Sequence, residues 1–485
     1  MVVDLQLAGA TAASLPAACL TGGGHTSSLA ADGLRARCDL GPVPADQEAT
    51  ASIELTVGPA APQIAVQAGP YDNAGTVLVH EVSGVADVPY YRLLSSPDFL
   101  NADIADLSVS RWDHWEPGMP NSWNPVYETA LDKILADWAA FHPDAVSVIG
   151  DLVNGRWIKD PDRLRMFGPV DTPAHRRQTI ALAATTYYTA WVQRFTDADL
   201  QVFPGIGDHD LGDNPWKGSR LFDQKRRDAG LYRSLFAKYL TTNPDGSARF
   251  ASRPVGSPWE LTSYAVRPDP EVQLVMLDVF RSTKNNVVAE VGPAQLAWLK
   301  GVLAKAQADG VDWIMVQGHV PVLGPVRRGP SSGLMYRHGS HSALWALFEK
   351  YGVDVYFSGE VHASTAIVRD GIAQVSHGGN VGYGGTATSR GGTSFVVADF
   401  SAGELSMRLF SWNRTQDDSD RLWQMAGNRI PVEKYFNGPP VQIGSLTITN
   451  NGSSSVNHPV VVARTGVLTP FDPATEPGPW SPELP

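Results

Sequence analysis

Four short stretches decide how this sequence folds: Gly150-Asp151, Gly207-Asp208-His209-Asp210, Gly318-His319 and Gly359-Glu360-Val361-His362. Each follows a short apolar run that predicts a β-strand, so each is expected at the C-terminal end of a strand. Asp, Glu and His are the side chains that bind metal ions such as zinc, manganese and iron. One aspartate after a strand carries little information, but four such ends in one chain predict a single metal centre to which all of them contribute.

The sequence around these stretches alternates between strands and helices from about residue 90 to 415. Helical spacing is found at 127–141, 175–195, 227–240, 293–308 and 340–351, and apolar runs at 145–149, 200–203, 272–277, 313–316 and 353–357. Short strand-like runs follow at 365–368, 372–375, 394–397 and 405–409. The alternation predicts an α/β domain, and the final run predicts antiparallel strands that join a second sheet. Ligands bind such sheets beyond the carboxyl ends of the strands, where the four stretches are expected.

The flanks of this domain have a different, β-rich pattern. Residues 1–70 alternate polar and apolar side chains between turn residues and show no helical period, which predicts a small β-sandwich. The further divisions expected are a linker at 71–89, the central domain at 90–425 and a β-rich C-terminal extension at 426–485. Strands at 445–449 and 459–463 would form either an appended hairpin or the remnant of another β-module.

The first 70 residues resemble the immunoglobulin-like repeat modules of bacterial surface and secreted proteins. In these modules one Cys precedes a Gly-rich turn and a second leads into a Cys-Asp-Leu-Gly stretch, here Cys38-Asp39-Leu40-Gly41. The only other cysteine is Cys19. A Cys19–Cys38 disulfide would close a loop of about 20 residues and stabilise the fold by about 3 kcal/mol, and two free thiols are the alternative. A disulfide would place the chain in an oxidising compartment, so we expect a secreted protein.

Composition excludes several classes of protein. At 485 residues, 43% hydrophobic and 18% charged, the chain fits a globular protein of two or three domains. The net charge of −12 argues against a general affinity for the nucleic acid backbone or for an anionic membrane. No apolar run reaches about 18 residues, so no membrane span is predicted. The start Met1-Val2-Val3-Asp4 does not have the pattern of an intact signal peptide, and it would suit either a mature form with an added Met or a cytoplasmic start.

Taken in order, the four stretches resemble the signature of the calcineurin-like metallophosphoesterase superfamily, which includes the purple acid phosphatases. That signature runs Asp-x-His or Asp-x-x, Gly-Asp, Gly-Asn-His-Asp/Glu, Gly-His and Gly-His-x-His, and its last four elements have counterparts here, within residues 90–415. The resemblance implies a four-layer α/β/β/α sandwich and a hydrolase of phosphate esters. It also implies two divalent metal ions and in-line attack by a metal-bound hydroxide, with no covalent enzyme intermediate.

The resemblance gives each matched residue a role. Metal A would bind Asp103, Asp151 and His362, and metal B would bind Asp151, Asp208, His319 and Glu360. His209 would stay off the metals and assist the leaving group, and Asp210 would orient it and favour its protonated form. The first element is expected where Asp103 follows the apolar pair Phe99-Leu100; Ala105 stands at its usual His position, so Asp106 is a second candidate.

Two positions depart from the signature. Asp208 stands where Asn is usual and Glu360 where His is usual, and both can still donate an oxygen to a metal. The added carboxylates favour oxygen-preferring ions such as Mn²⁺, Mg²⁺ or Ca²⁺, with Zn²⁺ and Fe left open. They would also weaken binding of a phosphate dianion unless a cation compensates. The candidates for that cation are Arg156, Arg327, Arg328 and Arg337.

These features lead to one expected function and two alternatives. The first is a secreted, binuclear metal-dependent phosphoesterase acting on a small-molecule or envelope-polymer phosphate ester. The second is a non-catalytic secreted or surface protein in which a degenerate site binds a metal or ligand. The third is carbohydrate binding or adhesion through the β-modules and Trp-rich loops. Substrate, mono- or diester preference, metal identity and oligomeric state stay open, because fold-level analogy does not choose among them.

Overall fold

We analysed a computed structural model of the chain. It describes residues 2–8, 10–12, 14–15, 17, 19–22, 25–31, 33, 35–40, 55–57, 63–69, 80–82, 89–96, 98–99, 125–153, 155, 157–158, 167–212, 220–283, 287–323, 334–360, 365–376, 394–412, 440–449, 460–462 and 468–470. These residues fall into two compact units, Met1–Tyr90 and Tyr91–Pro485. Each unit is described by itself below.

The first unit consists of antiparallel strands. Its main sheet has the order β5-β6-β1-β8-β9, formed by Ser28–Leu29, Arg35–Asp39, Val2–Ala8, Gln63–Gly69 and His80–Val82. Two small ribbons accompany it, β2 (Ala10–Ala12) with β7 (Leu55–Val57) and β3 (Thr21–Gly22) with β4 (His25–Thr26). Cys19 and Cys38 form a disulfide, which confirms the predicted pairing. The immunoglobulin-like assignment of this unit stays a prediction.

The second unit contains two six-stranded sheets. The first has the order β12-β11-β10-β21-β22-β23, formed by Val202–Pro204, Ala145–Val148, Tyr91–Ser95, Ser394–Phe400, Glu404–Ser411 and Val441–Thr449. The second has the order β13-β14-β17-β18-β20-β19, formed by Tyr264–Asp269, Val272–Leu277, Trp313–Gly318, Val355–Ser358, Ile372–Ser376 and Thr365–Arg369. In each sheet the strands nearest the predicted centre are parallel: β10, β11 and β12 in the first, and β14, β17, β18 and β20 in the second.

Among the residues described, five longer helices connect the strands: α1 (Pro125–Ala139), α2 (Pro173–Asp197), α3 (Arg220–Phe236), α4 (Pro293–Ala308) and α5 (Ala343–Tyr351). Shorter elements are η2 (His209–Leu211), the π-helical η3 (Ala237–Thr241), η4 (Gly339–His341), the hairpin β15 (Phe280–Ser282) with β16 (Val287–Ala289), and the ribbon β24 (Val460–Val462) with β25 (Leu468–Pro470). Two of these helices begin at a side-chain hydroxyl that caps the first turn. The Thr172 hydroxyl caps α2 by accepting from His175 N, and Ser342 caps α5 by accepting from Trp345 N.

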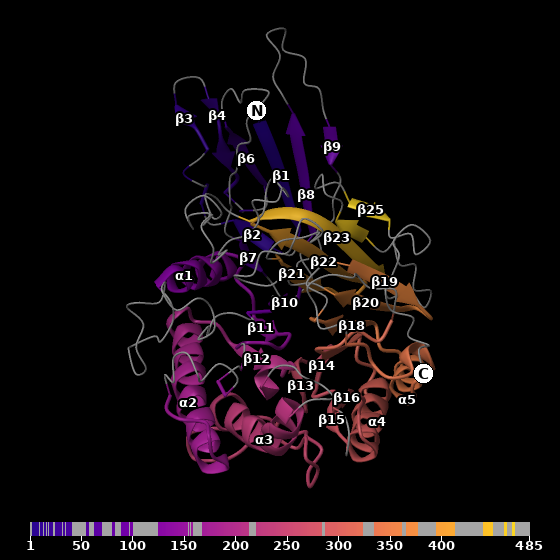
Figure 1. The fold of residues 1–485 in the computed structure, drawn as a ribbon. Helices are drawn as coiled ribbons and strands as arrows, with labels where there is room; N and C mark the ends of the chain where they lie inside the picture. The colour runs from indigo at the N-terminus through magenta and orange to yellow at the C-terminus, as the bar shows by residue number, and fades with distance from the viewer. Residues whose placement is uncertain are drawn as a thin grey trace. The chain divides into compact units, whose positions relative to one another are not determined.

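Side-chain contacts show how these elements pack. Trp138 of α1 and Trp191 of α2 both contact the ring of Phe99, just beyond β10 of the first sheet. On the second sheet, Phe348 of α5 contacts Tyr356 of β18. Figure 1 shows α2 beside α3 and α4 beside α5, at opposite sides of the second unit.

The two sheets contact each other through buried polar groups. The hydroxyl of Ser147 in β11 donates a hydrogen bond to Gln317 Oε1 in β17, and Gln317 Nε2 donates to the carbonyl of Val148. Each polar atom is satisfied by an atom of the opposite sheet, so the pair fixes the two sheets against each other close to their carboxyl ends. Within the described ranges, no helix is both long enough and apolar enough to cross a membrane.

The mixed α/β class of the second unit is confirmed, with most predicted elements near their expected bounds. One strand was placed wrongly. We expected the first strand to end in the apolar pair Phe99-Leu100, whereas β10 is Tyr91–Ser95 and parallel to β11. The strand at 445–449 also has a different role from the hairpin or separate module expected, because β23 pairs antiparallel with β22 and continues the first sheet.

Candidate metal centre

Five acidic or imidazole side chains follow the C-terminal ends of five strands. Asp98 follows β10, Asp151 follows β11, Asp208 follows β12, His319 follows β17 and Glu360 follows β18. All five are buried. The first three strands belong to one sheet and the last two to the other, so the packing of the two sheets brings the residues together.

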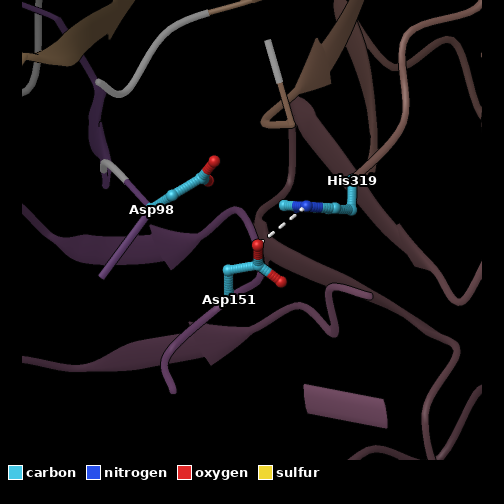
Figure 2. Close-up of side chains that lie close together, drawn as sticks. All are labelled: Asp98, Asp151 and His319. Atoms are coloured by element: carbon cyan, nitrogen blue, oxygen red, sulfur yellow. Dashed lines mark ion pairs between the residues drawn. The ribbon is translucent and has the colours of Figure 1, made fainter. Parts of the chain in front are cut away.

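The donor atoms of these residues form overlapping groups. Asp98, Asp151 and His319 offer one atom each within 4.8 Å of one another, and so do Asp208, His319 and Glu360. His319 Nε2 lies 3.3 Å from Asp151 Oδ2, 3.2 Å from Asp208 Oδ1 and 3.7 Å from Glu360 Oε2. Figure 2 shows the side chains of Asp98, Asp151 and His319 pointing toward a common space, with the ion pair of His319 and Asp151 dashed. His319 therefore lies at the meeting point of the carboxylates.

Backbone geometry at the strand ends holds these side chains in place. Asp151 has φ 55° and Glu360 has φ 57°, in the left-handed region that non-glycine residues rarely adopt. Such strain costs of order 1–3 kcal/mol per residue and persists only where the surroundings enforce it. The enforcing contacts include two backbone N–H groups: His209 N donates to Asp151 Oδ1 (3.0 Å), and Glu360 N donates to Asp98 Oδ2 (3.1 Å).

Two glycines allow the backbone to approach the centre. A Cβ atom on Gly207 would lie 2.0 Å from Asp151 Oδ1, and one on Gly359 would lie 2.5 Å from Asp98 Oδ1 and 2.8 Å from His319 Nδ1. Only glycine fits at either position without displacing a donor group. The glycines of the predicted motifs thus have a steric reason that the sequence alone did not give.

The electrostatics of the centre favour positive charge. Burial raises the pKa of Asp151, and the negative charge of Asp208 raises it further against the opposing effect of His319. Burial alone would lower the pKa of His319, but the charge of Asp151 and the close approach of the Asp208 and Glu360 carboxylates raise it well above the usual range. The carboxylates thus stabilise the positive charge of a protonated His319, and they would stabilise a metal cation at the same place for the same reason.

These residues fit a metal ion. Asp151 Oδ2 and His319 Nε2 are buried and have no hydrogen-bond partner among the described residues. A buried polar atom without a partner is costly, so such atoms often mark a missing ion or water. The donor set of carboxylate oxygens and one imidazole nitrogen suits divalent ions.

His209 and Asp210 lie at the edge of this centre, in η2. His209 Nε2 is 3.9 Å from Asp208 Oδ2, and Asp151, Asp208 and His209 form a third group of close donor atoms. Asp210 is placed differently from the prediction. Instead of orienting the His209 ring, its Oδ2 accepts from the backbone N–H of Asp151 and of Gly207, both at 2.9 Å, and its Oδ1 accepts from Tyr188. Burial and the charge of Asp151 raise the pKa of Asp210 to about 8.

The structure brings together five of the eight site residues predicted from the sequence: Asp151, Asp208, His209, His319 and Glu360. The Asp210 carboxylate accepts hydrogen bonds from the backbone N–H groups of Asp151 and Gly207, and so holds the two loops that carry the first three of these residues. Asp103, its alternative Asp106 and His362 lie outside the described residues, as do Arg156, Arg327 and Arg328. Arg337 is described, and it forms an ion pair with Glu290.

Asp98 belongs to the centre and was missed. The signal that could have found it is the stretch Tyr91-Arg92-Leu93-Leu94, apolar except for Arg92, which precedes Ser95-Ser96-Pro97-Asp98 in the same strand-then-carboxylate pattern as the other stretches. We took Phe99 as part of that strand instead. The structure shows Phe99 packed against Trp138 and Trp191 in the core, one residue beyond the carboxylate.

Comparison with known proteins gives a match by sequence and several by structure. The sequence matches the family described as calcineurin-like phosphoesterase over residues 119–364, just over half of the chain. None of the curated proteins compared with the chain matches it.

Similar solved structures include a dimetal phosphatase from Danio rerio (15% identity, 66% of this chain and 95% of that chain, TM-score 0.43). They also include purple acid phosphatase PPD1 from yellow lupin, Lupinus luteus (14% identity, 84% and 67%, TM-score 0.38), and GAP50, the anchor in the inner membrane complex of Plasmodium (12% identity, 66% and 84%, TM-score 0.36). At these TM-scores the likenesses carry no argument about what this chain does.

Proposed function

Because the chain belongs to the calcineurin-like phosphoesterase family, we propose that it is a hydrolase of phosphate esters that depends on two divalent metal ions. The observation that carries the proposal is the convergence of five buried donor residues from five strand ends, belonging to two different sheets. The contacts of α1 and α2 with one sheet and of α5 with the other support a four-layer α/β/β/α arrangement for the domain.

The overlapping donor groups suggest how two ions would share the centre. Asp151 belongs both to the group with Asp98 and His319 and to the group with Asp208 and His209, so it is our candidate for the bridging carboxylate. Asp98 takes the place that we first expected Asp103 to fill, and Asp208, His319 and Glu360 would bind the second ion. His362 remains the further ligand expected from the sequence. When bound, two divalent ions supply Lewis acidity to the phosphoryl group and lower the pKa of a water molecule.

The chain's own residues would orient the substrate and transfer a proton. His209 is the candidate general acid: its ring lies at the edge of the donor cluster, and its backbone N–H is tied to Asp151. The Asp208 carboxylate lies 3.9 Å from His209 Nε2, within reach of an ion pair with the imidazolium that this role requires. The hydrogen bond from His209 N to Asp151 Oδ1 keeps the proton donor at a fixed distance from the candidate bridging residue.

The support for the proposed location of the protein comes from the first unit. A disulfide persists in an oxidising compartment, so the Cys19–Cys38 bond supports our proposal that the protein is secreted. A small-molecule or envelope-polymer phosphate ester would then be the substrate class. We further propose an immunoglobulin-like module at 1–70, a linker at 71–89 whose strand β9 pairs with β8, a catalytic domain at 90–425, and an extension at 426–485 whose strand β23 continues the first sheet of that domain.

One observation favours a second candidate, a non-catalytic metal- or ligand-binding protein. Asp208 and Glu360 make the described donor set rich in carboxylates, with four of them beside the imidazoles of His319 and His209. Such a set could bind a single ion firmly without arranging a phosphate ester for attack. The two candidates differ in turnover and in metal stoichiometry, which can both be measured.

The experiment measures bound metal and hydrolysis of p-nitrophenyl phosphate and bis(p-nitrophenyl) phosphate, with and without Mn²⁺. We expect bound metal, turnover of at least one ester, and a loss of more than about 100-fold in Asp151→Asn, since even changes to groups that only hydrogen-bond a metal ligand cost about 10–100-fold. Asp309→Asn, at an exposed ion pair after α4, is the matched control and should stay active. Bound metal without turnover of either ester would support the non-catalytic candidate. If the protein neither bound metal nor hydrolysed either ester, the enzyme proposal would be wrong.

A further inference from the structure

Three aromatic side chains hold the loops that carry Asp151 and His209, and they approach these loops from the helices behind the centre. Tyr188 and Trp191 of α2 and Tyr232 of α3 are all buried. Tyr188 OH donates to Asp210 Oδ1 (3.1 Å), Trp191 Nε1 donates to the carbonyl of Leu152 (3.0 Å), and Tyr232 OH donates to the carbonyl of Gly155 (3.0 Å). Each therefore joins a helix to a loop directly beside the proposed centre.

Asp210 is the point through which Tyr188 reaches the centre. Its Oδ2 accepts from Asp151 N, in the loop after β11, and from Gly207 N, in the loop after β12. In the opposite direction, His209 N donates to Asp151 Oδ1. The two loops are thus joined by reciprocal hydrogen bonds, and the buried carboxylate of Asp210 is fixed between them by the Tyr188 hydroxyl.

The same loops are packed too closely to move independently. A Cβ atom on Gly155 would lie 2.0 Å from the carbonyl oxygen of His209, so the segment after Asp151 lies directly on the His209 backbone. The Trp157 ring stacks on Tyr187 and Tyr232 and meets Tyr188 edge-on, with ring centroids 5.3–6.1 Å apart. Aromatic pairs in this range contribute about 0.5–1.5 kcal/mol each beyond their buried area, so the aromatic layer is a rigid support.

We propose that Tyr188 is a positioning residue of the proposed phosphoesterase: through Asp210, its hydroxyl sets the position of the candidate bridging carboxylate Asp151 relative to the candidate proton donor His209. Tyr188 touches neither substrate nor metal in this arrangement. Its effect comes from fixing two loops whose groups must act on the same phosphoryl ester from different directions. The catalytic part of this inference rests on the proposed function, while the structural part does not.

The test is Tyr188→Phe, which removes one oxygen and keeps the ring. Thr241→Val is the matched control, because it deletes another buried hydroxyl, which donates to the carbonyls of Ala237 and Leu261 away from the centre. We measure kcat and KM on phenyl phosphate and p-nitrophenyl phosphate. A misplaced proton donor matters more for the poorer leaving group, so we expect Tyr188→Phe to lower kcat about tenfold or more on phenyl phosphate, with a smaller loss on p-nitrophenyl phosphate and an unchanged KM.

Amide hydrogen exchange gives a readout that does not depend on activity. In Tyr188→Phe we expect faster exchange at Asp151 and Gly207, whose N–H groups bond Asp210, with exchange elsewhere unchanged. If the wild-type protein hydrolysed no ester, the proposed function would fail, while this exchange pattern would still decide whether Tyr188 positions the loops. Unchanged exchange at both amides, equal kcat losses on the two esters, or the same loss in Thr241→Val would each overturn the proposal.

Discussion

Adding one methyl group at Gly207 should disable the proposed centre. In Gly207→Ala the new Cβ would lie 2.0 Å from Asp151 Oδ1 and 2.5 Å from Asp151 N, whereas ordinary contact begins at 3.4 Å. The Asp151 carboxylate would therefore have to retreat by more than 1 Å, or the loop would have to shift as far. A misplacement of about 1 Å costs about 100-fold in rate, and overpacking of this kind costs about 1–3 kcal/mol of stability.

The assay compares Gly207→Ala with Gly301→Ala, at a glycine of α4 where an added Cβ would meet nothing within 4 Å beyond the adjacent residues and the backbone of its own helix. We measure kcat/KM on p-nitrophenyl phosphate with Mn²⁺, bound metal per chain, and the melting temperature. Gly207→Ala should lose about 100-fold or more in kcat/KM and some bound metal. Gly301→Ala should keep full activity and gain up to about 1 kcal/mol from helix propensity. Wild-type activity and metal content in Gly207→Ala would refute the reasoning, because Asp151 would then not need the position that the structure gives it.

Three further perturbations test other parts of the structure. Burial, together with the charge of Asp312, raises the pKa of Asp354 to about 7, so the stability that this carboxyl contributes is present below about pH 4 and is lost as the pH rises toward 7. In urea unfolding, Asp354→Asn should therefore gain free energy of unfolding relative to the wild type as the pH rises from about 4 to 7. A difference in free energy of unfolding that stays constant over this range would contradict the prediction. Cys38→Ser should destabilise the unit Met1–Tyr90 by about 3 kcal/mol, measured by denaturant unfolding with and without reductant, and an equal response of both proteins to reductant would contradict this. Removing metal with EDTA should lower the melting temperature, and Mn²⁺ at 100 times its Kd should restore it by adding about 2.7 kcal/mol to the free energy of unfolding. The melting temperature of Asp151→Asn should change little with either treatment; a change equal to that of the wild type would place the bound metal elsewhere.

The parts of the fold that depend on local pattern were predicted well. The helix expected at 293–308 is α4 (Pro293–Ala308), because a proline marks its first position and most of its residues have high helix propensity. The strands before Asp151 and His319 were also found, because fully buried parallel strands appear as near-continuous apolar runs.

The parts of the fold and of the site that depend on tertiary contacts were not predicted from the sequence. In β10, Arg92 interrupts the apolar pattern, and only the structure shows that it pairs with Asp399 of β21 in the neighbouring strand. That interruption hid the strand and therefore Asp98. Asp210 was expected to orient the adjacent His209 ring because the two are neighbours in sequence. Its hydrogen bonds instead reach 59 residues back to Asp151 N, a pairing that no local pattern encodes.

Anomalous scattering from Mn²⁺-soaked crystals tests the central claim most directly. Two anomalous peaks about 3.5–4 Å apart are predicted, both within coordination distance of Asp151, one beside Asp98 and the other beside Asp208, His319 and Glu360. A difference map without a peak at these carboxylates, or with one ion bound away from Asp151, would contradict the two-metal account.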